Sequence, residues 1–92
     1  MTVPERDLPD RELVARCQQG HPGAFDELVV RHQDRVHTAV ARFCGNAEDA
    51  ADIVQRAFIN AFRKIQEFKG DAAFSTWIYR IAFNQAISFR RE

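Results

Sequence analysis

The chain has 92 residues, of which 46% are apolar and 28% charged, and its 13 basic and 13 acidic side chains give a formal net charge of zero. This length suits one domain with a modest core, and the composition excludes an intrinsically disordered protein. No apolar run approaches the ~20 residues that span a bilayer, and the first residues lack the apolar core of a signal peptide, so we expect a cytoplasmic protein.

The charges are unevenly distributed. Residues 1–50 hold six Arg and nine acidic residues, whereas residues 51–92 hold seven basic and four acidic residues. The basic second half suits contact with phosphate, and the acidic first half suits a basic or mixed protein partner. Cys17 and Cys44 show neither CxxC nor CxxH spacing, which indicates small buried side chains rather than a zinc site or a redox pair.

Apolar residues recur at steps of three and four throughout, which predicts an all-α fold. Residues 1–9 hold two prolines and charges of alternating sign, and we expect a loose, flexible tail there ahead of one domain over residues 10–92. The first helix should follow Pro9, with Asp10 as its N-cap, and should stop at Gly20.

The second and third helices carry clear apolar stripes. The second should begin after residues 22–23 and end at residues 45–46, and the third should run from about Glu48 to Phe68, with Gly70 ending it. The stripe of the second helix comprises Phe25, Leu28, Val29, His32, Val36, Val40 and Phe43. The stripe of the third comprises Ala50, Ile53, Val54, Ala57, Phe58, Ala61, Phe62 and Ile65.

The fourth helix, with Ser75 or Thr76 as its N-cap, is apolar on more sides than a surface helix needs. Its predicted inward side comprises Trp77, Ile78, Ile81, Ala82 and Phe89. A different side repeats Tyr79, Phe83 and Ile87 at steps of four, with Arg80 and Asn84 beside them. We expect the four helices to bury their stripes in a compact bundle.

The sequence gives no support for catalysis or metal binding. It has no Ser/His/Asp or Cys/His set, no glycine-rich phosphate loop and no HExxH motif. His32 and His37 are five residues apart and so point to different faces of a helix. We therefore expect neither an enzyme nor a bound metal or cofactor.

The remaining signal is a group of aromatic and basic residues in the last third of the chain. Proteins that hold single-stranded nucleic acid combine a cationic groove with rings on which bases stack. The candidates for the groove are Lys64, Lys69, Arg80, Arg90 and Arg91, and those for rings and a base-reading amide are Trp77, Tyr79, Phe83 and Asn84. Aromatic residues at helical spacing are usually core, an interpretation that we favour for Phe74 and Trp77 and leave open for Tyr79 and Phe83.

Three motifs occur in order: GxxxAFxxLVxRxxxxV at Gly20–Val36, DxVQxAFxxAFR at Asp52–Arg63 and FxGDxxFxTWxYRIAxN at Phe68–Asn84. With these motifs the chain from Asp10 to Arg91 resembles region 2 of an extracytoplasmic-function (ECF) sigma factor, the promoter-recognition subunit of bacterial RNA polymerase, and in particular the envelope-stress subgroup. The resemblance implies a non-catalytic domain that binds core polymerase and recognises and helps melt the promoter −10 element.

The resemblance also implies which residues meet DNA. The loop from Lys69 to Ser75 and the start of the fourth helix would take the non-template strand, with one base flipped into a pocket. The residues carried over from the family are Phe68, Gly70, Asp71, Ala73, Phe74, Tyr79 and Asn84, with Lys69 and Arg80 on phosphates. Ser75, Trp77 and Phe83 complete the set of expected DNA-binding residues. Whether Phe68 and Phe74 line this pocket or hold its walls stays open.

The third helix would dock on the clamp helices of the polymerase β′ subunit. The implied contacts are Asp49, Asp52, Gln55, Arg56 and Asn60. Arg56 is a departure, because the family usually has Glu or Asp after Gln55, and it reverses a charge on this surface. Phe83 is a second departure, since the family commonly has a small or aliphatic residue there.

An alternative function is a protein-interaction module whose main activity is binding an anti-sigma factor. A complete factor continues to a second helical domain that reads the −35 element, and we expect no such domain within these 92 residues. We expect either an excised domain or a reduced factor that relies on −10 contacts alone.

Overall fold

A computed structural model of the chain describes residues 3–91, with the backbone only at residue 91. Over this range the all-α prediction is confirmed, and the described part contains no strand. The elements in chain order are η1 (Glu5–Asp7), α1 (Asp10–Gln18), α2 (Pro22–Cys44), α3 (Ala47–Arg63), η2 (Ile65–Glu67) and α4 (Phe74–Arg91), where η marks one turn of 3₁₀-helix. None of the helices in the described part has the length and apolar character needed to cross a membrane.

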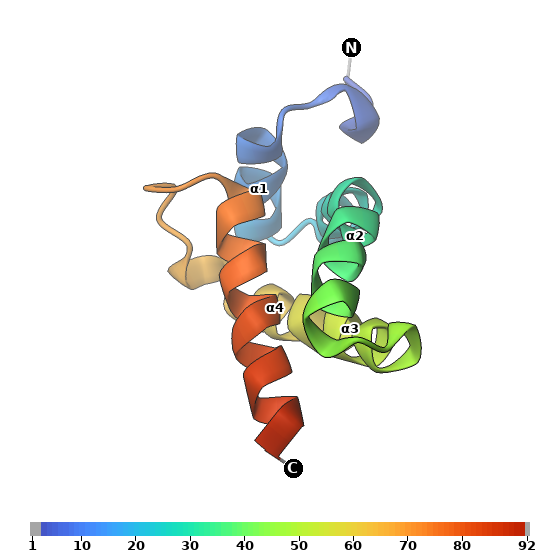
Figure 1. The fold of residues 1–92 in the computed structure, drawn as a ribbon. Coiled ribbons are helices and arrows are strands. Elements are labelled where there is room, and N and C mark those ends of the chain that lie inside the picture. The colour runs from blue at the N-terminus through green and yellow to red at the C-terminus, as the bar shows by residue number, and fades with distance from the viewer. Residues whose placement is uncertain (1–2, 92) are drawn as a thin grey trace.

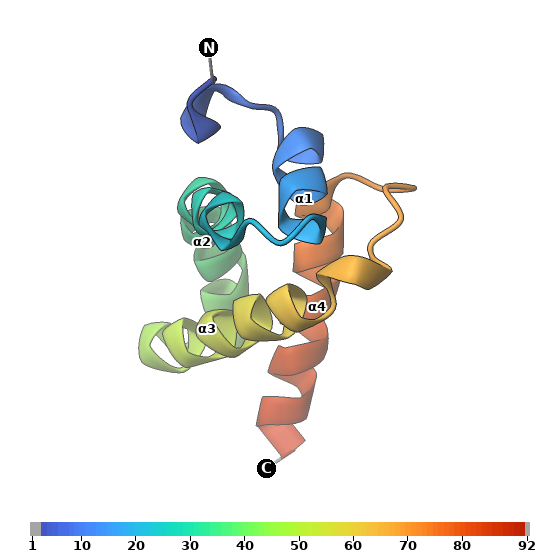
Figure 2. The ribbon, with the colours of Figure 1, turned by 180° about the vertical axis from the view of Figure 1, so that it is seen from behind.

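The helices cross one another around a shared core. Figures 1 and 2 show α1 beside the N-terminal half of α4, and α3 crossing α4 near its middle while packing against α2. The C-terminal turns of α4 extend beyond the other helices, which gives the molecule its elongated dimensions of 47 × 22 × 20 Å. The loop between η2 and α4 projects away from the bundle in both views.

Local sequence explains the ends of α2 and the start of α3. Pro22 is the first residue of α2, where a backbone N–H would have no partner within the helix, so the missing N–H of proline costs no hydrogen bond. Gly45 ends α2 in the left-handed conformation, with φ of 72°, and its N–H donates to the carbonyl oxygen of Ala41 at 2.7 Å. The side chain of Asn46 then caps α3 by accepting a hydrogen bond from the N–H of Asp49 at 2.9 Å.

The predicted ends of two helices are wrong around the projecting loop. α3 ends at Arg63: the N–H of Lys64 is shared between the carbonyls of Asn60 and Ala61, and the bonds that follow, from Glu67 to Lys64 and from Phe68 to Ile65, have the 3₁₀ pattern of η2. α4 begins at Phe74 rather than after Ser75 or Thr76, since the carbonyl of Ala73 accepts the N–H of Trp77 at 3.1 Å. The segment from 68 to 73 is therefore a separate loop.

Apolar sides of all four α-helices meet in one core. The largest fully buried side chains are Leu13, Leu28, Val36, Val40, Ile53 and Ile78, and each contributes about 1.5–3 kcal/mol relative to an exposed one. The predicted stripes of α2 and α3 are buried for the most part, but Phe43 and Phe62 are 41% and 46% exposed. Ala86, one turn after Ala82, is also buried and lengthens the inward side of α4.

The N-terminal segment around η1 packs against α2. Leu8 is buried, and the guanidinium of Arg31 donates to the carbonyl oxygens of Glu5 at 3.1 Å and Arg6 at 2.9 Å. The multiple donors of an arginine allow it to bind a turn of backbone in this way. Glu5 and Arg6, which lie in the expected tail, thus make defined contacts with α2, and residues 1–2 lie outside the described part.

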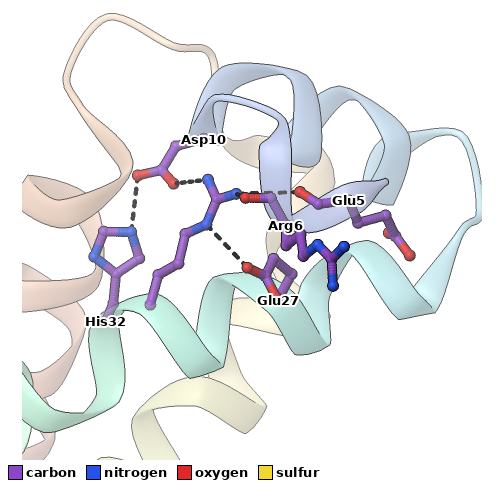
Figure 3. Close-up of polar contacts among 6 residues, drawn as sticks. Glu5, Arg6, Asp10, Glu27 and His32 are labelled. Atoms are coloured by element: carbon purple, nitrogen blue, oxygen red, sulfur yellow. Dashed lines mark hydrogen bonds and ion pairs between the residues drawn. The ribbon is translucent and has the colours of Figure 1, made fainter. Parts of the chain in front are cut away.

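The prediction that Asp10 is the N-cap of α1 is wrong. Asp10 is the first residue of α1, and Pro9 holds the N-cap position. The carboxylate of Asp10 lies 3.1 Å from Nη1 of Arg31 and 2.8 Å from Nε2 of His32, both on α2. Figure 3 shows Asp10 facing His32 across this contact. Glu27, one turn before Arg31, pairs with Nε of the same guanidinium at 3.2 Å. Asp10 thus joins the first turn of α1 to α2.

Candidate nucleic-acid interface

The loop of residues 68–73, here called the α4 loop, presents its polar residues to solvent. Lys69, Gly70, Asp71 and Ala73 are all exposed. Gly70 has φ of 78°, a conformation that residues with a Cβ rarely adopt. A Cβ built on Gly70 meets no atom within 4 Å, so the backbone conformation, and not lack of space, is what requires glycine there.

Three aromatic rings support the α4 loop from the side of the core. The ring centroids of Phe68 and Trp77 are 4.9 Å apart, and that of Phe74 lies 6.3 Å from Phe68 and 5.9 Å from Trp77. Phe74 is only 3% exposed and also contacts the rings of Phe25 and His32. Little of the Phe74 ring is accessible in this conformation, whereas Phe68 and Trp77 are half-buried at its edge.

One face of α4 is hollowed. This hollow, here called the α4 hollow, is lined by Thr76, Tyr79, Arg80, Phe83 and Asn84. Its two rings, Tyr79 and Phe83, are nearly parallel, at 18° with centroids 6.3 Å apart. Arg80 and Asn84 are exposed, and Ser75 is half-buried one residue before the hollow begins. The structure therefore brings together four of the predicted contacts on one helix face.

Sequence reasoning missed Thr76 and Phe43 at this face. Thr76 lies one turn before Tyr79 and Arg80, so extending the spacing of that side of α4 towards its start would have found it. Phe43 was placed in the core, but its ring makes an edge contact with Phe83, with centroids 5.7 Å apart. The guanidinium carbon of Arg90 lies 5.3 Å from the centre of the Phe43 ring.

The predicted cations are not gathered in one groove. Lys69 lies on the α4 loop, and Arg80 and Arg90 follow on α4, all three of them exposed. Lys64 is exposed at the end of α3. The side chain of Arg91 lies outside the described part.

The predicted polymerase contacts lie on different sides of α3. Asp52 and Arg56 form an ion pair at 3.2 Å, and the Arg56 guanidinium lies 5.7 Å from the ring centre of Phe89 on α4. Nδ2 of Asn60 donates to Oε1 of Gln85 on α4 at 2.9 Å. The amide of Asn60 is thus engaged within the bundle. Asp49 is half-buried in the first turn of α3, where its N–H binds the Asn46 side chain.

Gln55 alone among these five residues lines a groove between α2 and α3, here called the α2/α3 groove. The groove has a volume of about 600 Å³ and a largely apolar wall. Its apolar lining includes Phe25, Val29, Val54, Phe58, Ile59 and Phe62. Ile59 and Phe62 are each 46% exposed, which indicates a surface that a partner can cover. Asp26, Asp34 and Arg63 place charges at its rim.

No group of three or more His, Cys, Asp and Glu side chains in residues 3–91 is arranged to hold a metal ion. Both cysteines are free thiols, with Cys17 buried and Cys44 half-buried.

Comparison with known proteins gives the family. The family model of Sigma-70 region 2 matches residues 28–92. The ECF RNA polymerase sigma-E factor of Escherichia coli is 48% identical over 82 residues, which are 89% of this chain and 42% of that protein. The RNA polymerase sigma-H factor of Pseudomonas aeruginosa is 47% identical over 77 residues, which are 84% of this chain and 40% of that protein. The chain thus spans about two fifths of the length of these relatives.

A solved structure agrees with this result. The fold matches an engineered region 2 of sigmaE, solved by NMR in complex with GTAAAA, with a TM-score of 0.83 and 45% identity. The match covers 89% of this chain and 85% of that one. Similar sequence and similar helix arrangement therefore agree, and the chain belongs to the Sigma-70 region 2 family, within the ECF sigma factors.

Proposed function

We propose that this chain binds the non-template strand of a promoter −10 element through the α4 loop and the α4 hollow, and holds one flipped base there. The observation that carries the proposal is the hollow, in which two nearly parallel rings, a guanidinium and an amide share one helix face. The match to a region 2 structure in complex with GTAAAA supports this choice of ligand.

The free energy that contacts in the α4 hollow can supply is comparable with the free energy that capture of a flipped base requires. Stacking on Tyr79 or Phe83 contributes roughly 1–3 kcal/mol per base, which is comparable with the few kcal/mol that flipping a base costs. The amide of Asn84 donates and accepts, so it can read a base edge. Lys69 and Arg80 bind phosphates. The domain thus favours open DNA by binding the single strand more tightly than the duplex, and this role involves no enzymatic step.

The test compares two fluorescent single strands, one containing GTAAAA and one with the same bases in scrambled order. Tyr79→Ala and Asn84→Ala should weaken GTAAAA binding about tenfold, and Tyr79→Phe should retain most of it because the ring remains. Gln19→Ala, at an exposed residue that directly follows α1, serves as the control. If both alanine variants bind GTAAAA as tightly as the wild type, the assignment of the hollow is wrong.

The α2/α3 groove supports a second contact, with a protein. Its exposed apolar side chains, Ile59 and Phe62, lie beside Gln55, and we propose that the clamp helices of the polymerase β′ subunit dock there. Phe62→Glu should abolish capture of purified core polymerase. Val30→Glu is a matched control, because Val30 is 64% exposed on α2 and does not line the groove. Equal capture by both variants would exclude the groove as the docking surface.

An anti-sigma factor is the alternative occupant of the α2/α3 groove. The same apolar lining favours any helical partner, so purified polymerase and a purified anti-sigma domain should be compared with the Phe62→Glu and Val30→Glu variants. Competition between the two proteins for the wild-type chain would show that they share this surface. Either role places the protein in the cytoplasm, where transcription occurs.

A further inference from the structure

Gln18, the last residue of α1, connects that helix to the segment leading into the α4 loop. Its Nε2 donates to the carbonyl oxygens of Ile65 and Phe68, at 2.9 Å in each case. An amide nitrogen carries two hydrogens, so both donors of Gln18 are used on this one segment. The two carbonyls bracket η2, one in its first residue and the other just after its last.

The carbonyl of Phe68 lies where helical hydrogen bonding has stopped. Phe68 is extended, with φ of −74° and ψ of 117°, so its carbonyl points away from the turn before it, and Gln18 supplies the donor. The Phe68 ring rests on Trp77, and Lys69 and Gly70 follow directly. Fixing the Phe68 peptide therefore fixes the point at which the α4 loop leaves the bundle.

We propose that Gln18 is a positioning residue for the α4 loop: it sets the exit of the loop so that the loop and the α4 hollow face the same strand. The inference rests on the proposed function. Gln18 acts through the backbone of Phe68, from a position 50 residues earlier in the chain. A glutamate could not replace it, because its carboxylate would place acceptor oxygens against two carbonyl oxygens.

Three substitutions distinguish the effect of the hydrogen-bond donors of Gln18 from the effect of its side-chain size. Gln18→Met keeps an unbranched chain of similar length and removes both donors. Gln18→Lys keeps donors, since an ammonium carries three. Gln66→Met is the matched control, because Gln66 donates to the carbonyl of Gln18 at 2.9 Å and so joins the same two segments without touching Phe68.

Binding of GTAAAA and scrambled single strands gives the first measurement. Gln18→Met should bind GTAAAA about tenfold more weakly, since two net hydrogen bonds that hold the loop are lost, with binding of the scrambled strand unchanged. Gln18→Lys should recover most of the selectivity, and Gln66→Met should match the wild type. A purely structural role would instead weaken binding of both strands together.

Amide NMR shifts of Gly70 and Asp71, and the emission of the only tryptophan, Trp77, give a measurement without DNA. Gln18→Met should move these signals and Gln66→Met should not. Unchanged signals and unchanged selectivity in Gln18→Met would overturn the inference while leaving the proposed function intact. If the wild type itself binds both strands equally, the proposed function fails, and the signals of Gly70 and Trp77 still decide whether Gln18 holds the loop.

Discussion

His32 and Asp10 connect α2 to the first turn of α1 through a hydrogen bond of 2.8 Å between Nε2 and Oδ2. His32 is 9% exposed, and the centre of its ring lies 5.3 Å from the centre of the Phe74 ring at the start of α4. The His32–Asp10 pair at the edge of the core thus lies next to Phe74, which is the first residue of α4. This arrangement leads to a prediction about stability.

Asp10→Ala should lower the free energy of unfolding by about 1–2 kcal/mol, because it removes hydrogen bonds to His32 and Arg31 that are only partly exposed to solvent. Urea unfolding followed by Trp77 emission measures this value. Asp7→Ala is the control, since Asp7 is an exposed carboxylate of η1. Equal losses in the two variants would mean that the Asp10 contacts contribute nothing specific.

Phe74 and Phe83 should behave in opposite ways when each is replaced by alanine. Phe74 is buried among Phe25, Phe68 and Trp77, so Phe74→Ala should cost about 3–5 kcal/mol of stability. Phe83 is half-buried, with an edge contact to Phe43 worth about 1 kcal/mol. Phe83→Ala should therefore stay folded and bind GTAAAA about tenfold more weakly. A folded Phe83→Ala with full GTAAAA affinity would remove this ring from the proposed contacts.

Helical periodicity explains why much of the candidate site could be predicted. Tyr79, Arg80, Phe83 and Asn84 recur at steps of three and four, so any α-helix through them places them on one face. The start of α4 was harder to predict, because Ser75 and Thr76 are good N-caps by residue type. α4 instead begins at Phe74, and the burial of the Phe74 ring fixes the backbone just before Ser75 and Thr76.

Other features of the fold are set by contacts between segments far apart in the chain, which a local sequence pattern does not show. Ile65 fits both an α-helix and a 3₁₀ turn, so its apolar character could not reveal where α3 ends. Phe62 continues the stripe of α3, yet no element of the described part covers it fully. The bonds from Gln18 and Arg31 to distant carbonyls join segments far apart in sequence, and side-chain spacing alone carries no information about them.

Cys17 should be the less reactive of the two thiols. Burial, together with the negative charges of Glu5 and Asp26, raises the pKa of Cys17 to about 11. Because the thiolate is the reactive form, a thiol reagent at about pH 8 should modify Cys44 first. Rates measured on Cys17→Ala and Cys44→Ala, each with one remaining thiol, test this order. Faster modification of Cys17 than of Cys44 would contradict the burial of Cys17.

The raised pKa of Cys17 also predicts how stability changes in alkali. Between pH 9.0 and about pH 11 the unfolded chain loses the thiol proton while the folded chain retains it. The folded state then binds more protons, so the free energy of unfolding falls as the pH rises. Cys17→Ala should show a smaller fall than the wild type in urea titrations at about pH 8 and about pH 10. Parallel falls would mean that other groups cause the loss.

Gly70 and Gly45 offer a matched pair for testing the α4 loop. Both have left-handed φ, 78° and 72°, and a Cβ on either meets no atom within 4 Å. An alanine should therefore cost a similar amount at each position, about 1–2 kcal/mol. The two sites differ in place, because Gly45 ends α2 and Gly70 lies in the middle of the α4 loop.

Gly70→Ala should reduce selectivity for GTAAAA over the scrambled strand, because the loop must change its backbone conformation to relieve the strain. Gly45→Ala should lose similar stability and keep its selectivity. Binding is measured at a temperature where urea and thermal unfolding show both variants to be folded, so that differences report the loop and not the folded fraction. Equal selectivity in the two variants would mean that the conformation of the α4 loop does not matter for binding, and loss of selectivity in both would indicate an effect of stability alone.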